Sequence, residues 1–186
     1  MSNQSLKIFC VTVFLCTTLL LLSCRNDSIS EVIRIDGEMV LIQRVIDGDT
    51  FELPDGRKVR LLGIDTPEKF NNEKLKNEYA SPEDRLVIMK LGELSSDYVT
   101  RMIEGKEVIH VPEENYEDTD RYGRLLRYVY LPDGTLINAK IIEDGFGEVY
   151  EKYPVSKTNE FRSLQVQARE NSRGLWGDIE GLKNFR

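Results

Sequence analysis

The chain has 186 residues, of which 40% are hydrophobic and 31% charged, and this suits one globular domain with short appendages. The formal net charge of −7 argues against a protein that coats DNA through a broad basic face. It does not exclude an enzyme that handles a single phosphate at a local cationic site, because net charge governs association rather than chemistry.

The N-terminal segment differs in composition from the rest of the chain. Lys7 is its only charge before an apolar run at residues 8–22. A basic residue before an apolar stretch is typical of an export signal, and about 15 residues are short for a bilayer span. A permanent membrane-anchoring helix is the alternative. The sequence Leu21-Leu22-Ser23-Cys24 resembles the bacterial lipobox, in which the cysteine becomes the lipidated first residue. We therefore expect an exported lipoprotein, held by Cys24 on the extracytoplasmic side of a membrane.

The cysteines agree with this interpretation. Cys10 and Cys16 lie within the predicted signal peptide, residues 1–23, so Cys24 is the only thiol of the mature chain. An exported chain with one cysteine forms no internal disulfide, and its fold must depend on its core. We expect residues 24–37 to be a tether with a short strand near its end, at residues 32–35. Residues 38–178 then form the domain, and residues 179–186 a tail.

The first half of the domain predicts strands. Residues 39–46 are apolar and β-branched, as in a strand that is covered on both faces. Residues 50–53 and 59–64 flank the turn sequence Pro54-Asp55-Gly56 and predict a β-hairpin. We interpret the polar residues 69–78 as a mobile loop at the edge of the site.

A long helix is expected next. Ser81-Pro82-Glu83-Asp84 combines a capping serine, a proline at the first helical position and acids in the first turn. One apolar stripe follows, and Gly105 ends it; the stripe consists of Val87, Leu91, Leu94, Tyr98 and Met102. Residues 106–111 and 125–131 predict strands, and residues 136–143 and 157–171 predict helices. This order, without strict βαβ alternation, indicates an α+β domain built on a small barrel.

Three segments concentrate the residues that suit chemistry: Asp47-Gly48-Asp49-Thr50, the stretch 60–68, and Asp120-Arg121-Tyr122-Gly123-Arg124. A hairpin that folds back near residues 56–57 would place Asp49 opposite residue 64 or 65, and paired residues lie about 5 Å apart. Asp49 and Asp65 would then repel each other unless a cation lay between them. A hard divalent cation with oxygen ligands satisfies both carboxylates.

The strand that carries Arg60 and Asp65 must bend if both are to serve one site. Asp65 lies five positions after Arg60, and in an ideal strand the two side chains would face opposite sides. Gly63 lies between them and is the natural place for a bulge, and Pro67 then ends the ladder and presents Glu68. Each segment alone could be an ordinary turn or helix start. Together, three acids and two arginines are what phosphodiester hydrolysis requires.

In order and spacing, these segments resemble the three signature motifs of the staphylococcal nuclease family. Arg173-Gly174-Leu175-Trp176 matches the family's tail, and the resemblance covers residues 38–177. It implies a five-stranded OB-type β-barrel with three helices. The implied site consists of Ca²⁺ ligands, phosphate-binding arginines, a general base and tyrosines that contact the nucleotide. The resemblance implies that Asp49, Asp65 and the backbone carbonyl of Thr66 bind Ca²⁺, and that Arg60 and Arg124 bind the phosphate. Glu68 would be the general base, and Tyr122 and Tyr153 would contact the nucleotide.

The resemblance implies a calcium-dependent endonuclease of low sequence specificity. We expect a monomer that cuts DNA and RNA and leaves 3′-phosphates and 5′-hydroxyls. For Tyr122 and Tyr153 ordinary packing is the alternative, and Glu151 stands where the family's type member has a tyrosine. The segment 112–120 is longer and more acidic than is usual in the family, and nothing in the sequence gives it a role.

Two alternative functions belong to other classes of protein. A non-catalytic OB-type lipoprotein that binds nucleic acid would have lost acids or arginines, and all of them are present. A calcium-binding structural lipoprotein would give Arg60 and Arg124 no task.

Overall fold

The computed structural model describes residues 35–179. The predicted signal peptide, Cys24 and most of the strand expected at 32–35 lie outside the described residues. The strands are β1 (Glu38–Leu41), β2 (Arg44–Val45), β3 (Thr50–Glu52), β4 (Lys58–Leu61), β5 (Ile64–Asp65), β6 (Glu107–Val111), β7 (Leu125–Tyr130) and β8 (Glu148–Val149). The helices are α2 (Glu73–Glu78), α3 (Pro82–Ile103), α4 (Ile137–Glu143), α5 (Thr158–Glu170) and the 3₁₀ turn η1 (Gly174–Trp176).

The strands form a curved, barrel-like sheet that does not close. Its order is β1-β6-β7-β4-β3-β2, and β5 and β8 form a separate antiparallel pair. Every pairing in the larger sheet is antiparallel except that of β4 with β7, which places Arg60 beside Leu126. The prediction of an OB-type α+β fold is confirmed. This parallel pairing brings the β3–β4 hairpin next to the segment that precedes β7.

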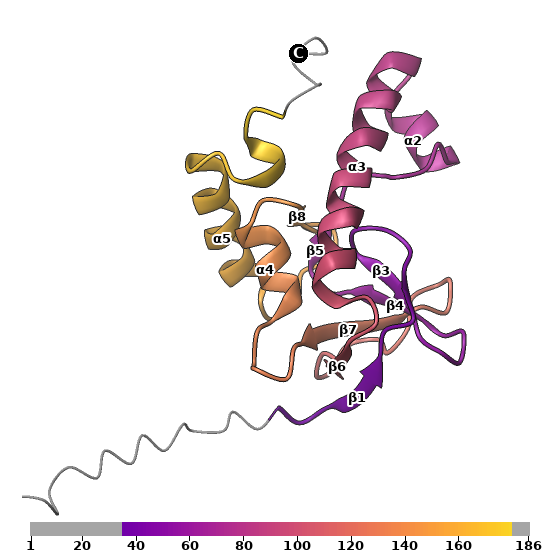
Figure 1. Ribbon diagram of the computed structural model, residues 1–186, viewed down its shortest axis with the longest axis vertical. Coiled ribbons are helices and arrows are strands. Elements are labelled where there is room, and N and C mark those ends of the chain that lie inside the picture. The colour runs from indigo at the N-terminus through magenta and orange to yellow at the C-terminus, as the bar shows by residue number, and fades with distance from the viewer. Residues whose placement is uncertain (1–34, 180–186) are drawn as a thin grey trace, which may run out of the picture. The chain divides into compact units, whose positions relative to one another are not determined.

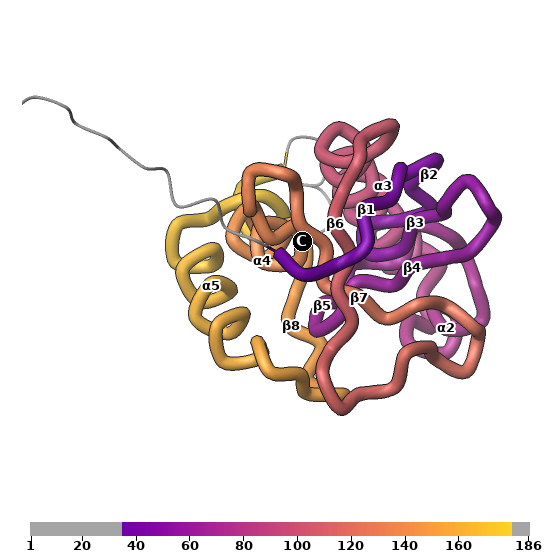
Figure 2. The backbone as a smooth tube through the Cα atoms, turned by 90° about the horizontal axis from the view of Figure 1, so that it is seen from below, coloured from indigo at the N-terminus to yellow at the C-terminus, as the bar shows by residue number. Residues whose placement is uncertain are grey.

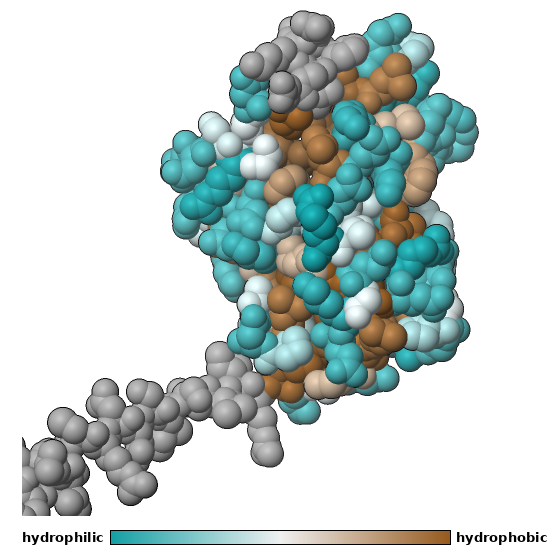
Figure 3. All heavy atoms as spheres, in the orientation of Figure 1, coloured by the Kyte–Doolittle hydropathy of each residue, from teal (hydrophilic) through white to brown (hydrophobic). Residues whose placement is uncertain are grey.

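The helices lie on two sides of the sheet. Figure 1 and Figure 2 place α4 and α5 side by side on one side, and α2 and α3 on the other. The fully buried core contains Phe51 of β3, Val129 of β7, Ile141 of α4 and Phe161 of α5. Charged and polar residues cover most of the face in Figure 3, with hydrophobic residues visible in smaller areas between them. No helix within residues 35–179 is long and apolar enough to cross a membrane.

The predicted strand 39–46 is wrong in two respects. It is broken into β1, which pairs with β6, and β2, which pairs with β3. Ile42 lies at the break and is fully buried, and its N–H donates to the carbonyl of Lys106. The strand is also not covered on both faces, because Met39 and Leu41 are 58% and 45% exposed. β1 is an edge strand with one neighbour, so its apolar residues do not imply burial.

The long helix agrees with its predicted signals. The Ser81 hydroxyl accepts a hydrogen bond from the N–H of Asp84, Pro82 is the first helical residue, and α3 ends at Ile103. The segment 69–78, predicted as a loop, instead contains α2. The side chain of Asn72 caps this helix by accepting from the N–H of Leu75, and Leu75 is fully buried. One buried leucine is too short a pattern to indicate a helix from periodicity, and packing decides the conformation here.

Candidate active site

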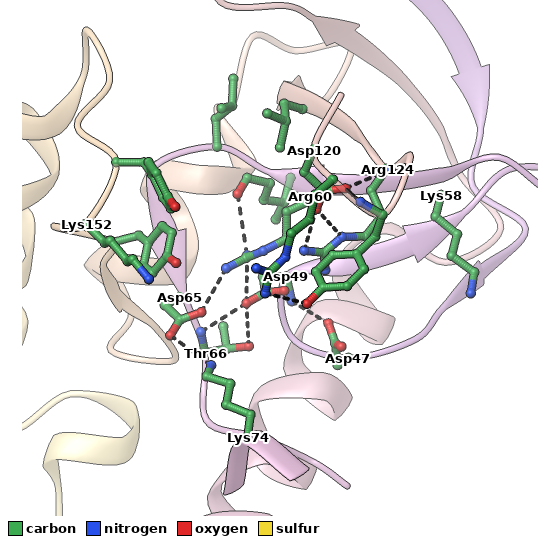
Figure 4. Close-up of a pocket in the computed structure, with 18 of the residues that line it drawn as sticks. Asp47, Asp49, Lys58, Arg60, Asp65, Thr66, Lys74, Asp120, Arg124 and Lys152 are labelled. Atoms are coloured by element: carbon green, nitrogen blue, oxygen red, sulfur yellow. Dashed lines mark hydrogen bonds and ion pairs between the residues drawn. The ribbon is translucent and has the colours of Figure 1, made fainter. Parts of the chain in front are cut away.

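The predicted site residues of the described chain line one cavity of about 660 Å³. They come from the ends of β3, β4 and β5, from the segment before β7 and from the segment after β8 (Figure 4). These residues are Asp49, Arg60, Asp65, Thr66, Glu68, Tyr122, Arg124 and Tyr153. The fold therefore joins three stretches that are distant in the sequence.

Arg60 is the centre of the site. Its Nη1 lies 2.7 Å from Asp49 Oδ2, and its Nη2 lies 2.8 Å from Asp65 Oδ1. The Arg60 and Asp49 side chains are only 11% and 8% exposed. Burial alone would lower the pKa of Arg60, but the charges of Asp49 and Asp65 outweigh it and raise that pKa, so the guanidinium stays charged. One planar, forked cation thus joins both carboxylates.

The predicted register that brought Asp49 opposite residue 64 or 65 is wrong. Thr50 pairs with Arg60, so the residue opposite Asp49 is Leu61, whose N–H donates to the Asp49 carbonyl. The hairpin turn is tight, because the N–H of Leu53 already donates to the carbonyl of Arg57. Asp49 and Asp65 nevertheless contact the same arginine, because a bend in the chain, and not cross-strand pairing, brings them close together.

That bend is at Gly63, as predicted. Gly63 has a φ of +73°, in the left-handed region that side chains disfavour. A Cβ there would lie 2.7 Å from Val155 Cγ2 and 2.9 Å from Phe161 Cε2. The chain leaves β4 at this turn and continues as β5, paired with β8. Arg60 and Asp65 can therefore face the same cavity although Asp65 lies five positions after Arg60.

Asp49 is held rigidly by neighbouring donors. Its Oδ2 accepts from both the N–H and the hydroxyl of Thr66 at 3.1 Å, and its Oδ1 accepts from the Thr50 hydroxyl at 2.9 Å. Burial, followed by the charge of Asp49, raises the pKa of Asp65, although Arg60 and Lys74 oppose the rise. The same two causes raise the pKa of Asp47 to about 7. The site holds more carboxylate than its central arginine neutralises.

Glu68 is placed by α2 and α3. Asn72 Nδ2 donates to its Oε2 at 2.7 Å, and Lys74 Nζ lies 2.7 Å from its Oε1. α3 approaches the backbone of Pro67 and Glu68 at Gly92, where an added Cβ would lie 2.6 Å from both carbonyl oxygens. The missing side chain at Gly92 thus lets a rigid helix support the turn that presents Glu68.

Arg124 is positioned by Asp120. Its Nε and Nη2 lie 2.7 Å from Asp120 Oδ2, and its Nη1 donates to the Thr50 hydroxyl at 3.3 Å. Although burial opposes the change, hydrogen bonds from Arg124 and Tyr122 lower the pKa of Asp120, which keeps this carboxylate charged. Thr50 contacts both Arg124 and Asp49, and so connects the second arginine to the first.

Tyr122 and Tyr153 both line the cavity. Tyr122 is 68% exposed, and the guanidinium of Arg124 lies 5.6 Å from the centre of its ring. Tyr153 is 54% exposed and leans against Tyr150, with ring centres 5.7 Å apart. This exposure leaves both rings open to stack on a flat ligand. Their predicted contact with a nucleotide stays a prediction.

Several residues of the site were not predicted. Asp120 lies inside a recognised motif, and its spacing of four residues from Arg124 was the available signal. Lys74 and Asn72 lie in the segment taken for a loop, so no sequence signal placed them at Glu68. Tyr150 comes within 5.8 Å of Arg60, measured from the guanidinium carbon to the ring centre. It follows a strand of two residues that sequence patterns do not detect.

The donor set suits a hard cation, and oxygen atoms converge on the cavity from Asp49, Asp65 and Thr66. Asp49 Oδ1 has a single donor within the described chain, and Lys74 is 3.6 Å from Asp65 Oδ2. No three His, Cys, Asp or Glu side chains of residues 35–179 form a group that could hold a metal by themselves. A cation would therefore need a backbone oxygen such as the Thr66 carbonyl.

The comparisons with known proteins agree with this geometry. The family model for the staphylococcal nuclease homologues matches residues 58–178. An "uncharacterized endonuclease" of Escherichia coli O157:H7 is 37% identical over 142 residues, which cover 75% of this chain and 77% of that protein. A thermonuclease of Staphylococcus intermedius is 30% identical over 142 residues, or 75% of this chain and 74% of that protein. Endonuclease YhcR of Bacillus subtilis (strain 168) is 28% identical over 76% of this chain but only 12% of its own length.

The contact at Gly92 predicts whether Gly92→Ala raises or lowers the free energy of unfolding. In a helix interior alanine is intrinsically better than glycine by about 1 kcal/mol, so Gly92→Ala should stabilise the protein if α3 has room. The 2.6 Å approach to Pro67 and Glu68 leaves none, and we expect a loss of about 1–3 kcal/mol from overpacking. Urea unfolding of both proteins measures the difference. A stabilised variant would contradict the tight contact.

Proposed function

Because this chain belongs to the staphylococcal nuclease family and is a nuclease, we propose that it is a calcium-dependent endonuclease of low sequence specificity that cleaves DNA and RNA. The observation that carries the proposal is the convergence of Arg60, Arg124 and Glu68 on one cavity. Two arginines and an acid from three separate segments are the groups that phosphodiester hydrolysis needs.

The arginines act on the phosphate. Each guanidinium donates forked, charge-assisted hydrogen bonds, and these strengthen as negative charge grows on the phosphoryl oxygens. Both are already oriented in the free protein, Arg60 by Asp49 and Asp65 and Arg124 by Asp120. Both Nη atoms of Arg60 contact the two proposed calcium ligands in the free protein, so binding of calcium and phosphate would replace these ion pairs.

Glu68 acts on the attacking water. Its carboxylate is 22% exposed at the cavity wall, and Asn72 and Lys74 fix its direction. In this position it accepts a proton from a water molecule or holds that water in line with the phosphorus. Tyr122 and Tyr153 stack on bases, and such contacts tolerate any base, which agrees with low sequence specificity.

Asp49, Asp65 and the Thr66 carbonyl would hold calcium. When bound, the ion polarises a phosphoryl oxygen and orients the substrate. Burial and then the charge of Asp49 raise the pKa of Asp65, and the proposal is supported because a divalent cation would relieve the repulsion between these two carboxylates. With two carboxylates the affinity should be weak, about 10⁻⁴–10⁻³ M as in extracellular calcium modules.

The rival reading, a non-catalytic nucleic-acid binder, would not need Glu68 held by two donors beside the arginines. We also propose that the chain acts as a monomer, held to a membrane by Cys24. The lipobox-like sequence before the domain supports the anchor. Acyl chains on Cys24 would hold the protein to a bilayer, because each buried methylene contributes about 0.8 kcal/mol.

Calcium removal provides one test. Cleavage of plasmid DNA should stop in excess chelator and return with Ca²⁺. Calcium should also raise the melting temperature, because a ligand at 100 times its Kd stabilises the native state by about 2.7 kcal/mol. Asp65→Ala should abolish both effects, whereas Asp97→Ala, at an exposed acid on α3, should abolish neither. Full activity in chelator would rule out the calcium requirement.

The arginines and Glu68 separate an enzyme from a binder. Arg124→Lys keeps the charge but loses the fork, and should lower the rate at saturating substrate by about 10³-fold or more. Glu68→Gln keeps the shape and should lower the rate by about 10²–10⁴-fold. Oligonucleotide affinity should change far less in both variants, and Arg101→Lys on α3 serves as the control. A collapse of affinity with a rate near that of the wild type would show that these residues only bind.

The anchor has its own test. Native expression should give membrane-bound protein, and Cys24→Ala should release the protein or leave it unprocessed. Intact mass spectrometry of the wild type should show acyl groups and loss of residues 1–23. An unmodified wild-type mass would end this proposal.

A further inference from the structure

Cations without an acidic partner gather around the cavity. Most lysines and arginines of residues 35–179 form ion pairs, as expected for a chain of net charge −7. Several do not, and Lys58, Arg121 and Lys152 are exposed members of this group that line the cavity. An acidic protein thus keeps local positive charge on the walls of its site.

Lys58 is unpaired because its cross-strand neighbour is occupied. It faces Glu52 in the register of β3 with β4, where an opposite-charge pair would be expected. Arg44 lies 3.0 Å from that carboxylate on the other side, from β2. Lys58 is therefore left free on the exposed edge of the cavity.

Lys152 is in the same situation on the opposite flank. The adjacent Glu151 forms a double contact with Arg162 of α5, at 2.9 and 2.5 Å. The ammonium of Lys152 lies 5.7 Å from the ring centre of Tyr153 and has no carboxylate within ion-pair distance in the described chain. On one flank Arg44 holds the carboxylate opposite Lys58, and on the other Arg162 holds the acid that precedes Lys152 in the sequence.

The two lysines lie on either side of the central arginine. Figure 4 shows Lys152 at one side of the view and Lys58 at the other, with Asp49, Arg60 and Asp65 between them. Lys58 and Arg60 point to the same face of β4, and alternate residues of a strand are about 7 Å apart. This spacing is comparable to that of neighbouring phosphates in an extended nucleic-acid strand. Glu117, Arg121 and Tyr122 also line the cavity.

We propose that Lys58 and Lys152 form a phosphate track, in which they bind the phosphates on the two sides of the scissile one. The proposal rests on the proposed function, because it takes the phosphate at Arg60 and Arg124 as the point of cleavage. An extended single strand would cross the cavity from Tyr153 and Lys152, over Arg60, to Lys58. The substrate is then recognised as a stretch of several nucleotides, with its backbone held on both sides of the cut.

Binding measured without cleavage tests the track. Fluorescence anisotropy in excess chelator gives the affinities of labelled single-stranded oligothymidylates of 2 and 12 nucleotides at several salt concentrations. Lys58→Gln and Lys152→Gln should each weaken binding of the 12-mer by about three- to tenfold, and the slope of log affinity against log salt should fall by about 0.7 for each lost contact. Binding of the 2-mer should weaken less, because it does not span both lysines. Lys106→Gln, at an exposed cation outside the cavity, should behave like the wild type.

The outcomes distinguish the track from the proposed function. Equal affinities and salt slopes for Lys58→Gln, Lys152→Gln and Lys106→Gln would overturn the track, whether or not the protein cleaves DNA. Equal losses for the 2-mer and the 12-mer would also overturn it, because the lysines would then act at a single phosphate. A wild type that binds as described but cleaves neither DNA nor RNA would instead refute the proposed function.

Discussion

The buried contact between Arg60 and Asp49 is the interaction on which the site depends. Taking two charges out of water costs several kcal/mol per ion, and a buried pair recovers this only with good geometry and further hydrogen bonds. Asp49 has them, from Thr50 and from the backbone and side chain of Thr66. Arg60 has a second carboxylate, Asp65. Each of these partners is itself a residue of the site, so satisfying the pair builds the site.

The same contact connects the remaining functional groups. Thr50 extends it to Arg124, and Asp65 extends it to Lys74 and from there to Glu68. On the far side, α3 supports the turn at Pro67 and Glu68 through the space left by Gly92. The groups that we propose to bind phosphate, to hold calcium and to accept a proton therefore belong to one connected network. A change at one member should be felt at the others, and single substitutions here will not be additive.

The sequence predicted which residues line the cavity better than how the chain brings them together. The helix starting at Ser81, the strands of residues 106–111 and 125–131 and the bend at Gly63 were recognisable, because capping residues, apolar runs and glycine act locally. The pairing of Asp49 with Leu61 was not, because hairpin register depends on a turn whose tightness one sequence does not fix. α2 and β8 are too short for periodicity to detect them, and they bring in Lys74 and Tyr150.

The parallel pairing of β4 with β7 has a consequence for when the site forms during synthesis and folding. Arg60 and Arg124 meet only when these strands come together, and the chain between them includes the whole of α3 and β6. Contacts so distant in sequence form late, because the entropy of closing a long loop must be overcome first. A growing or partly folded chain therefore carries no complete site. We therefore expect the protein to cleave nucleic acid only when its synthesis and folding are nearly finished.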